Sequence, residues 1–103
     1  MQESIGKLQL IEENLRSYLA QKQQVQAQLM ELESAVEALD GAKSAYRIIG
    51  SIMVEQSAGD TKKDLEERME RAKVRLASIE KQEEKAKQQA EKLQQEIMAG
   101  MKR

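Results

Sequence analysis

The sequence predicts a mainly α-helical fold: a long antiparallel two-helix coiled coil whose helices are joined by a central β-hairpin. Three observations lead to this prediction. Two long segments carry apolar residues at alternating spacings of three and four, which is the period of a supercoiled helix. Between them lies a β-branched, apolar stretch around one glycine, "AYRIIGSIMVEQ", Ala45 to Gln56. The chain of 103 residues has no proline, so nothing forbids long uninterrupted helices.

The composition also favours long helices over a compact globule. Hydrophobic residues make up 40% of the chain but aromatic residues only 2%, whereas a globular core normally uses large aromatic side chains. Lys and Arg number 17 against 18 Asp and Glu, so the chain lacks the basic excess of a nucleic-acid binder. His and Cys are absent, which removes the commonest metal ligand, the commonest general base and thiolate chemistry. We therefore expect no enzymatic activity, no metal, no cofactor and no nucleic-acid partner.

The first helix is expected over residues 4–40. Asp40-Gly41 follows it, and glycine is the usual residue just past a helix end because it tolerates positive φ. The residues at the coiled-coil spacing form a stripe that faces the partner helix, which we call the seam. All but one of the seam residues of this helix are apolar: Leu8, Ile11, Leu15, Tyr18, Lys22, Val25, Leu29, Leu32, Val36 and Leu39.

The second helix is expected over residues 60–99. Asp60 or Thr61 is expected to cap it, and the acidic residues that follow favour its positive N-terminal end. Its seam also has one charged member: Leu65, Met69, Ala72, Leu76, Ile79, Glu83, Ala86, Ala90, Leu93 and Ile97.

Folding one seam back on the other brings the two charged positions together. If Leu8 pairs with Ile97, the register carried along the helices places Lys22 opposite Glu83. We interpret this pair as a register device, as polar seam residues often are. The alternative is a proton-transfer or ligand site, but the pair lacks any third group.

The hairpin is expected over residues 44–56. Gly50-Ser51 suits a two-residue type II′ turn, which would pair Ile49 with Ile52, although a four-residue loop is also possible. An isolated hairpin is marginal in water and has two open edges, and the helices, which leave from one end, cannot cover it. We therefore interpret it as an oligomerisation element; the alternative is a simple connector. The residues expected to carry assembly are Tyr46, Ile48, Ile49, Gly50, Ile52, Met53 and Val54.

Both ends of the chain fall at the opposite end of the coiled coil. The apolar residues there exceed what the seam needs, and several are methionines, which are flexible and recur at adaptable binding surfaces. We interpret these ends as a binding surface; the alternative is ordinary frayed helix ends. The surplus residues are Met1, Ile5, Leu10, Met98 and Met101.

The order helix, hairpin, helix, with heptads on both sides of "AYRIIGSIMVEQ", resembles the β-type subunit of prefoldin, also called GimC. The resemblance covers nearly the whole chain. Its most specific parts are Tyr46-Arg47 and Gly50 in the hairpin, the strand 52–54 and "SIEKQEEKAKQQAEKLQ" in the second helix. The single hairpin distinguishes it from α-type subunits, which carry two, and the short, plain sequence looks archaeal.

This resemblance implies an ATP-independent chaperone, a holdase. In prefoldin, two α-type and four β-type subunits join their hairpins into an intersubunit double β-barrel, and the coiled-coil tips capture non-native proteins for a group II chaperonin. The implied partners are therefore α-type subunits, other copies of this chain, unfolded proteins and a group II chaperonin. The same ends, with Lys102 and Arg103, are also candidates for chaperonin contact. The residues expected to contact clients are Ile5, Leu8, Leu10, Ile11, Ile97, Met98 and Met101.

Two other functions are compatible with the pattern: a structural coiled-coil spacer or scaffold subunit without client binding, and a helical RNA-binding arm, which the balanced charge disfavours. No apolar run approaches the roughly 20 residues that span a membrane, and the start of the chain lacks the layout of a signal peptide. We expect a cytoplasmic protein without a membrane partner.

Overall fold

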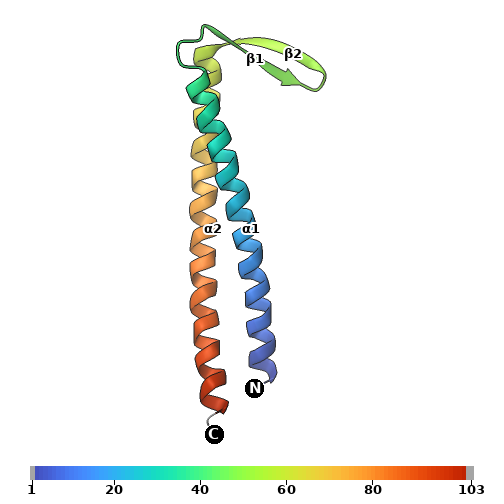
Figure 1. The fold of residues 1–103 in the computed structure, drawn as a ribbon, viewed down its shortest axis with the longest axis vertical. Helices are drawn as coiled ribbons and strands as arrows, with labels where there is room; N and C mark the ends of the chain where they lie inside the picture. Colours follow the sequence, from blue (N-terminus) through green and yellow to red (C-terminus); the bar gives the residue numbers. More distant parts are fainter. Residues whose placement is uncertain (1, 102–103) are drawn as a thin grey trace. The chain divides into compact units, whose positions relative to one another are not determined.

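Two helices and one hairpin make up the part of the chain that the computed structural model describes, residues 2–101. Helix α1 spans Gln2–Ala38 and helix α2 spans Ala58–Met101, with strands β1 (Ser44–Ile49) and β2 (Ile52–Ser57) between them (Figure 1). The predicted fold of two long helices joined by an antiparallel hairpin is therefore confirmed. Met1, Lys102 and Arg103, to which the sequence assigns roles at the free ends, lie outside the described residues.

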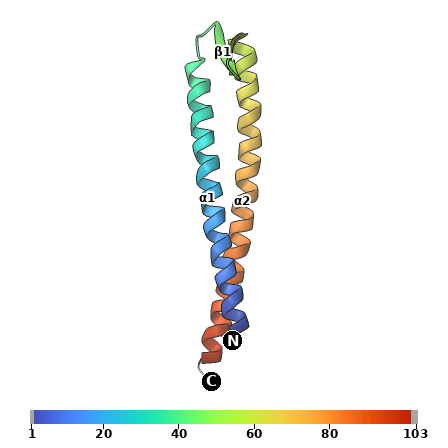
Figure 2. The same ribbon diagram turned by 90° about the vertical axis from the view of Figure 1, so that its right-hand side faces the viewer.

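The chain divides into two compact units, and both helices run through both. Unit 1 takes the described residues up to Gln24 and those from Leu76 onward, while unit 2 is Val25–Arg75. Within each unit, a segment of α1 runs antiparallel beside a segment of α2 (Figures 1 and 2). The expectation of one domain over residues 1–103 stays a prediction.

The hairpin has the predicted turn and register. Ile49 pairs with Ile52 and Ile48 with Met53, so the connection is the two residues Gly50-Ser51 and the alternative four-residue loop is wrong. Gly50 has φ +60°, and no non-glycine residue in the described range has positive φ. This combination indicates a type II′ turn, which only a glycine fits at its first position without strain.

The cap of α2 differs from the expectation that Asp60 or Thr61 would provide it. The helix begins at Ala58, directly after β2, and Ser57 Oγ accepts a hydrogen bond from the Asp60 backbone N–H at 3.1 Å. Ser57 is therefore the N-cap. Thr61 instead donates its hydroxyl hydrogen to the Ser57 carbonyl oxygen at 3.0 Å, one turn back along the chain. The strand runs into the helix without a loop, which moves the cap three residues earlier than Asp60.

The end of α1 lies at Ala38, two residues before the expected boundary at 40. The Ala42 N–H donates to the Leu39 carbonyl at 3.0 Å, so a turn follows the last helical residue. Gly41 has φ +79°, as expected for a glycine that follows a helix end.

The hydrophobic core is thin in both units. In unit 1 the buried residues are Ile79, Glu83, Ala86 and Ala90, three of them small or charged, and in unit 2 they are Val25, Leu29 and Ala58. Val25, at 1% exposure, is the one large side chain that is almost completely buried in the described range. The remaining seam residues are half-buried, which leaves the hairpin and the helix ends uncovered. Between residues 2 and 101, neither helix contains a stretch with the length and hydropathy of a membrane span.

Candidate functional site

The first exposed surface lies on the hairpin, and we define the hairpin surface as Tyr46, Ile48, Ile49, Ile52, Met53 and Val54. All six side chains are exposed, up to 71% for Ile48. Because side chains alternate along a strand, they divide evenly between the two faces. Tyr46, Ile48 and Met53 share one face, and the other three residues share the opposite face.

The base of the hairpin also contacts α2 through an exposed ion pair. Asp64 on α2 lies 3.8 Å from Arg47 on β1 and 3.4 Å from Arg68 on α2, measured between side-chain oxygen and nitrogen. The hairpin is thus held at its base, while its turn projects away from the helices of unit 2 (Figure 1). The open edges of this two-stranded sheet can pair with strands from another chain.

The second exposed surface lies at the free helix ends of unit 1, and we define the tip surface as Ile5, Leu10, Met98 and Met101. Leu10 is 58% exposed and Met98 is 59% exposed. The other three expected client-contact residues, Leu8, Ile11 and Ile97, are half-buried. They therefore offer less surface to a partner than the residues outside the seam.

A shallow groove of about 430 Å³ lies within the tip region. Leu10, Ile11 and Leu93 supply apolar lining, while Lys7, Gln89, Lys92 and Glu96 supply polar groups. The sequence analysis did not assign Lys7, Lys92 or Leu93 to this site. Lys7 could have been assigned from the sequence, because it lies three residues before Leu10 and therefore on the same helix face.

The two charged seam residues form an ion pair in unit 1. Lys22 Nζ lies 2.9 Å from Glu83 Oε1, and Lys87 Nζ lies 3.8 Å from the same oxygen. The hydrogen bond from Lys22 is the main cause that lowers the pKa of Glu83 below its ordinary value, and the charges of Lys22 and Lys87 add to it against the opposing effect of burial. The role of the pair as a register device stays a prediction.

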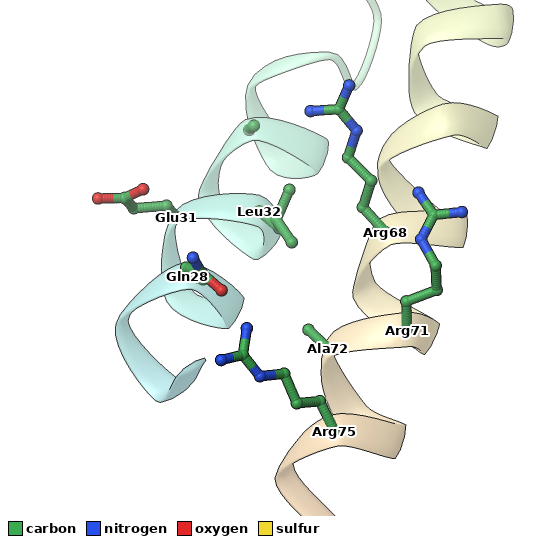
Figure 3. Close-up of a pocket in the computed structure, with 8 residues that line it drawn as sticks. Gln28, Glu31, Leu32, Arg68, Arg71, Ala72 and Arg75 are labelled. Atoms are coloured by element: carbon green, nitrogen blue, oxygen red, sulfur yellow. The ribbon is translucent and has the colours of Figure 1, made fainter. Parts of the chain in front are cut away.

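A third feature, in unit 2, was missed by the sequence analysis altogether. Three arginines of α2 rim a hollow of about 560 Å³ between α1 and α2 (Figure 3). Their spacing of three and four residues could have revealed a common helix face. We define this arginine groove as Gln28, Glu31, Leu32, Ala35, Arg68, Arg71, Ala72 and Arg75.

Other exposed apolar side chains are scattered singly: Leu19, Met30 and Val74. Single apolar residues of this kind are normal on a protein surface. Within residues 2–101 no cluster of three or more acidic side chains has the arrangement of a metal site.

Comparisons with known proteins agree with this arrangement. The family model described as "Prefoldin subunit" matches residues 2–103. The chain is 30% identical to the prefoldin subunit beta of Archaeoglobus fulgidus over 100 residues, which covers 94% of this chain and 86% of the relative. It is also 30% identical to the prefoldin subunit beta of Pyrococcus abyssi over 105 residues, covering 99% of this chain and 90% of the relative.

A solved structure is similar as well. The crystal structure of the prefoldin beta subunit from Thermococcus strain KS-1 superposes with a TM-score of 0.90 at 26% identity. The match covers 96% of this chain and 90% of the solved chain, so it includes both helices and the hairpin.

Proposed function

Because this chain belongs to the prefoldin family, we propose that it is a β-type subunit of an ATP-independent holdase, which captures non-native proteins at the tip surface and delivers them to a group II chaperonin in the cytoplasm. Family membership implies a chaperone role within a heteromeric complex that includes α-type subunits. The observation that carries the capture step is the exposed apolar side chains at the free ends of both helices.

The hairpin surface supports assembly. Six exposed aliphatic or aromatic side chains on a two-stranded ribbon would be costly to leave in water, at roughly 25 cal/mol for each Å² of apolar surface. Strand addition between hairpins would pair the open edges, and closure of the joined strands into a barrel would cover the apolar side chains on the inner face. In the proposed complex, hairpins from two α-type and four β-type subunits form an intersubunit β-barrel.

The tip surface supports client capture. Non-native proteins expose apolar segments, and Leu10 with Met98 offers apolar, conformationally adaptable contact area. Lys7, Lys92 and Glu96 line the tip groove together with Leu10, so charged groups lie beside the apolar contact area there.

Multivalency would provide useful affinity without a nucleotide. Each tip offers a small area and should bind weakly, but tips tethered to one platform raise the effective concentration for the next contact. Weak single contacts also allow stepwise release, because one tip can detach while others hold. Release to a chaperonin would follow from competition for the same apolar segments.

The test is suppression of aggregation by the complex reconstituted with an α-type subunit. We expect Leu10→Gln with Met98→Gln to lower the suppression of aggregation of several unrelated denatured proteins by severalfold, since both side chains lie outside the seam. The matched control is Met30→Gln with Val74→Gln, which removes one apolar side chain from each of the same two helices. Met30 and Val74 are 68% and 69% exposed, at least as exposed as Leu10 and Met98.

The control variant should suppress aggregation as the wild type does, and native mass spectrometry should find all complexes intact. If the Leu10 and Met98 variant retains full suppression, the tip assignment is wrong. If the wild-type complex itself suppresses nothing at near-stoichiometric ratio, the chain is a structural spacer subunit.

A further inference from the structure

The arginine groove lies entirely in unit 2 and has no part in the proposed capture of clients at the tip surface. Figure 3 shows Arg68 and Arg75 extending from α2 toward α1 on either side of Leu32 and Ala72. Leu32 and Ala72 are half-buried and form an apolar floor between the two guanidinium groups.

The positive charge of this groove is not neutralised within the described part of the chain. Arg68 pairs with Asp64 at 3.4 Å, but Arg71 and Arg75 form no ion pair there. Arg71 and Arg75 are four residues apart on one helix, a spacing at which like charges repel. Glu31 is the one carboxylate that lines the groove, and Figure 3 shows it directed away from the arginines. A bound anion would remove this repulsion.

The groove also indicates what kind of anion fits. Guanidinium groups bind carboxylates through two parallel hydrogen bonds, which makes arginine the preferred residue for such contacts. Arg68 and Arg75 are seven residues apart on one helix, about 10 Å at 1.5 Å per residue. An apolar floor between two separated cations matches a segment whose carboxylates flank an apolar side chain.

We propose that the arginine groove is a binding site for an acidic segment of a partner protein in which carboxylates alternate with apolar side chains. A nucleic acid fits less well, because its binding rests on phosphate contacts along a basic stripe. The groove does not have these properties, because it is only two helical turns long and includes the carboxylate of Glu31. The whole chain also has a net charge of −1. The proposal stands independently of the holdase activity.

The test is fluorescence anisotropy of the full chain, in its reconstituted complex, with a labelled short peptide in which glutamate and leucine alternate. We expect saturable binding that weakens with salt, and at least about tenfold weaker binding to the variant Arg71→Glu with Arg75→Glu, because charge-assisted hydrogen bonds are lost. The variant Arg71→Gln with Arg75→Gln, which introduces no new charge, should lose most of the binding as well. Circular dichroism establishes that both variants retain their helices.

The matched control is Lys81→Glu with Lys85→Glu, which makes the same change of charge at the same spacing on exposed positions of the same helix in unit 1. It should bind the peptide as the wild type does. Equal binding to the Arg71 and Arg75 variants would overturn the proposal. So would equal binding of a peptide that alternates glutamate with serine, tighter binding of a single-stranded RNA probe, or a change of oligomeric state in the arginine variants, which would identify a second copy as the occupant.

Discussion

Lys22 and Glu83 are the two residues that interrupt otherwise apolar seams, and the structure brings their charged atoms within 2.9 Å of each other. Glu83 has a side chain only 11% exposed, and it also lies near Lys87. Removal of one partner would leave the other charge poorly solvated inside the seam, so we expect the effect of either substitution to exceed that of an exposed charge.

The first prediction concerns pH. The pKa of Glu83 is lowered in the folded chain from its ordinary value of 4.5, chiefly by the hydrogen bond from Lys22. Its contribution to the free energy of unfolding is therefore complete above the ordinary pKa and is lost as the pH falls through the lower folded-state pKa. We expect the difference in Tm between wild type and Glu83→Gln to be largest near neutral pH and to shrink in acid.

Thermal unfolding followed by circular dichroism across this range measures that difference. Glu84→Gln, at the exposed neighbouring position, is the control and should lower Tm less. A difference between wild type and Glu83→Gln that stays constant from neutral to strongly acidic pH would contradict the assignment.

The second prediction concerns register. Lys22→Glu alone places two carboxylates on one seam layer and should lower Tm, whereas Lys22→Glu combined with Glu83→Lys should recover much of the loss. A double variant as unstable as the sum of the two single variants would show that the pair does not act as a unit.

At this scale the sequence predicted the pair but missed the helix cap. Heptad spacing determines which residues lie opposite each other, so a single charge on each seam was readable from the chain. The role of Ser57 could not be predicted from the sequence, because a serine between a strand and a helix can either lie in a loop or cap the helix. Which of the two occurs depends on whether the strand extends as far as the serine.

Among the elements, the hairpin depends most on a single position. Gly50 adopts φ +60° at the first position of the turn, a conformation that costs other residues about 1–2 kcal/mol. We expect Gly50→Ala to loosen the ladder between β1 and β2, seen as faster amide hydrogen exchange over residues 46–55, while exchange in the helices of unit 1 stays unchanged. Equal protection of the strands in both proteins would show that the turn tolerates a side chain.

The fourth prediction concerns the faces of the hairpin. Ile49 and Ile52 pair directly on one face, so Ile49→Lys with Ile52→Lys should place two charges where assembly would bury apolar area. Native mass spectrometry with an α-type subunit should then find small species in place of the complex of two α and four β chains. Ser44→Lys with Ser51→Lys, which adds the same two charges at exposed polar positions of the hairpin, is the control and should assemble. Normal assembly of the isoleucine variant would remove the hairpin surface from the interface.

The hairpin was predictable because its β-branched, apolar run and its glycine are local signals. The arginine groove was not, because its lining comes from two helices that are about 40 residues apart in the chain at that level. Charged residues at helical spacing usually form a solvated face. What distinguishes this face is that Arg71 and Arg75 form no ion pair within the described part of the chain.

For the whole molecule, stability should depend on concentration. Between residues 2 and 101 few side chains are buried, whereas the hairpin surface has exposed apolar area that the proposed assembly would cover. Any partner that binds the folded state alone raises its apparent stability by mass action. We therefore expect Tm to rise with protein concentration in a mixture with an α-type subunit, as measured by calorimetry. An unchanged Tm over a hundredfold dilution would indicate that the hairpin contributes nothing through assembly.

The uncovered hairpin also has a consequence for how the chain is produced. A newly made copy without partners displays apolar strands with open edges, which can pair with strands of other chains. If the hairpin assembles as proposed, copies in excess of their partners would keep the same kind of apolar surface that the proposed chaperone captures. The six exposed side chains of the hairpin surface would then favour synthesis of this chain in proportion to its partners.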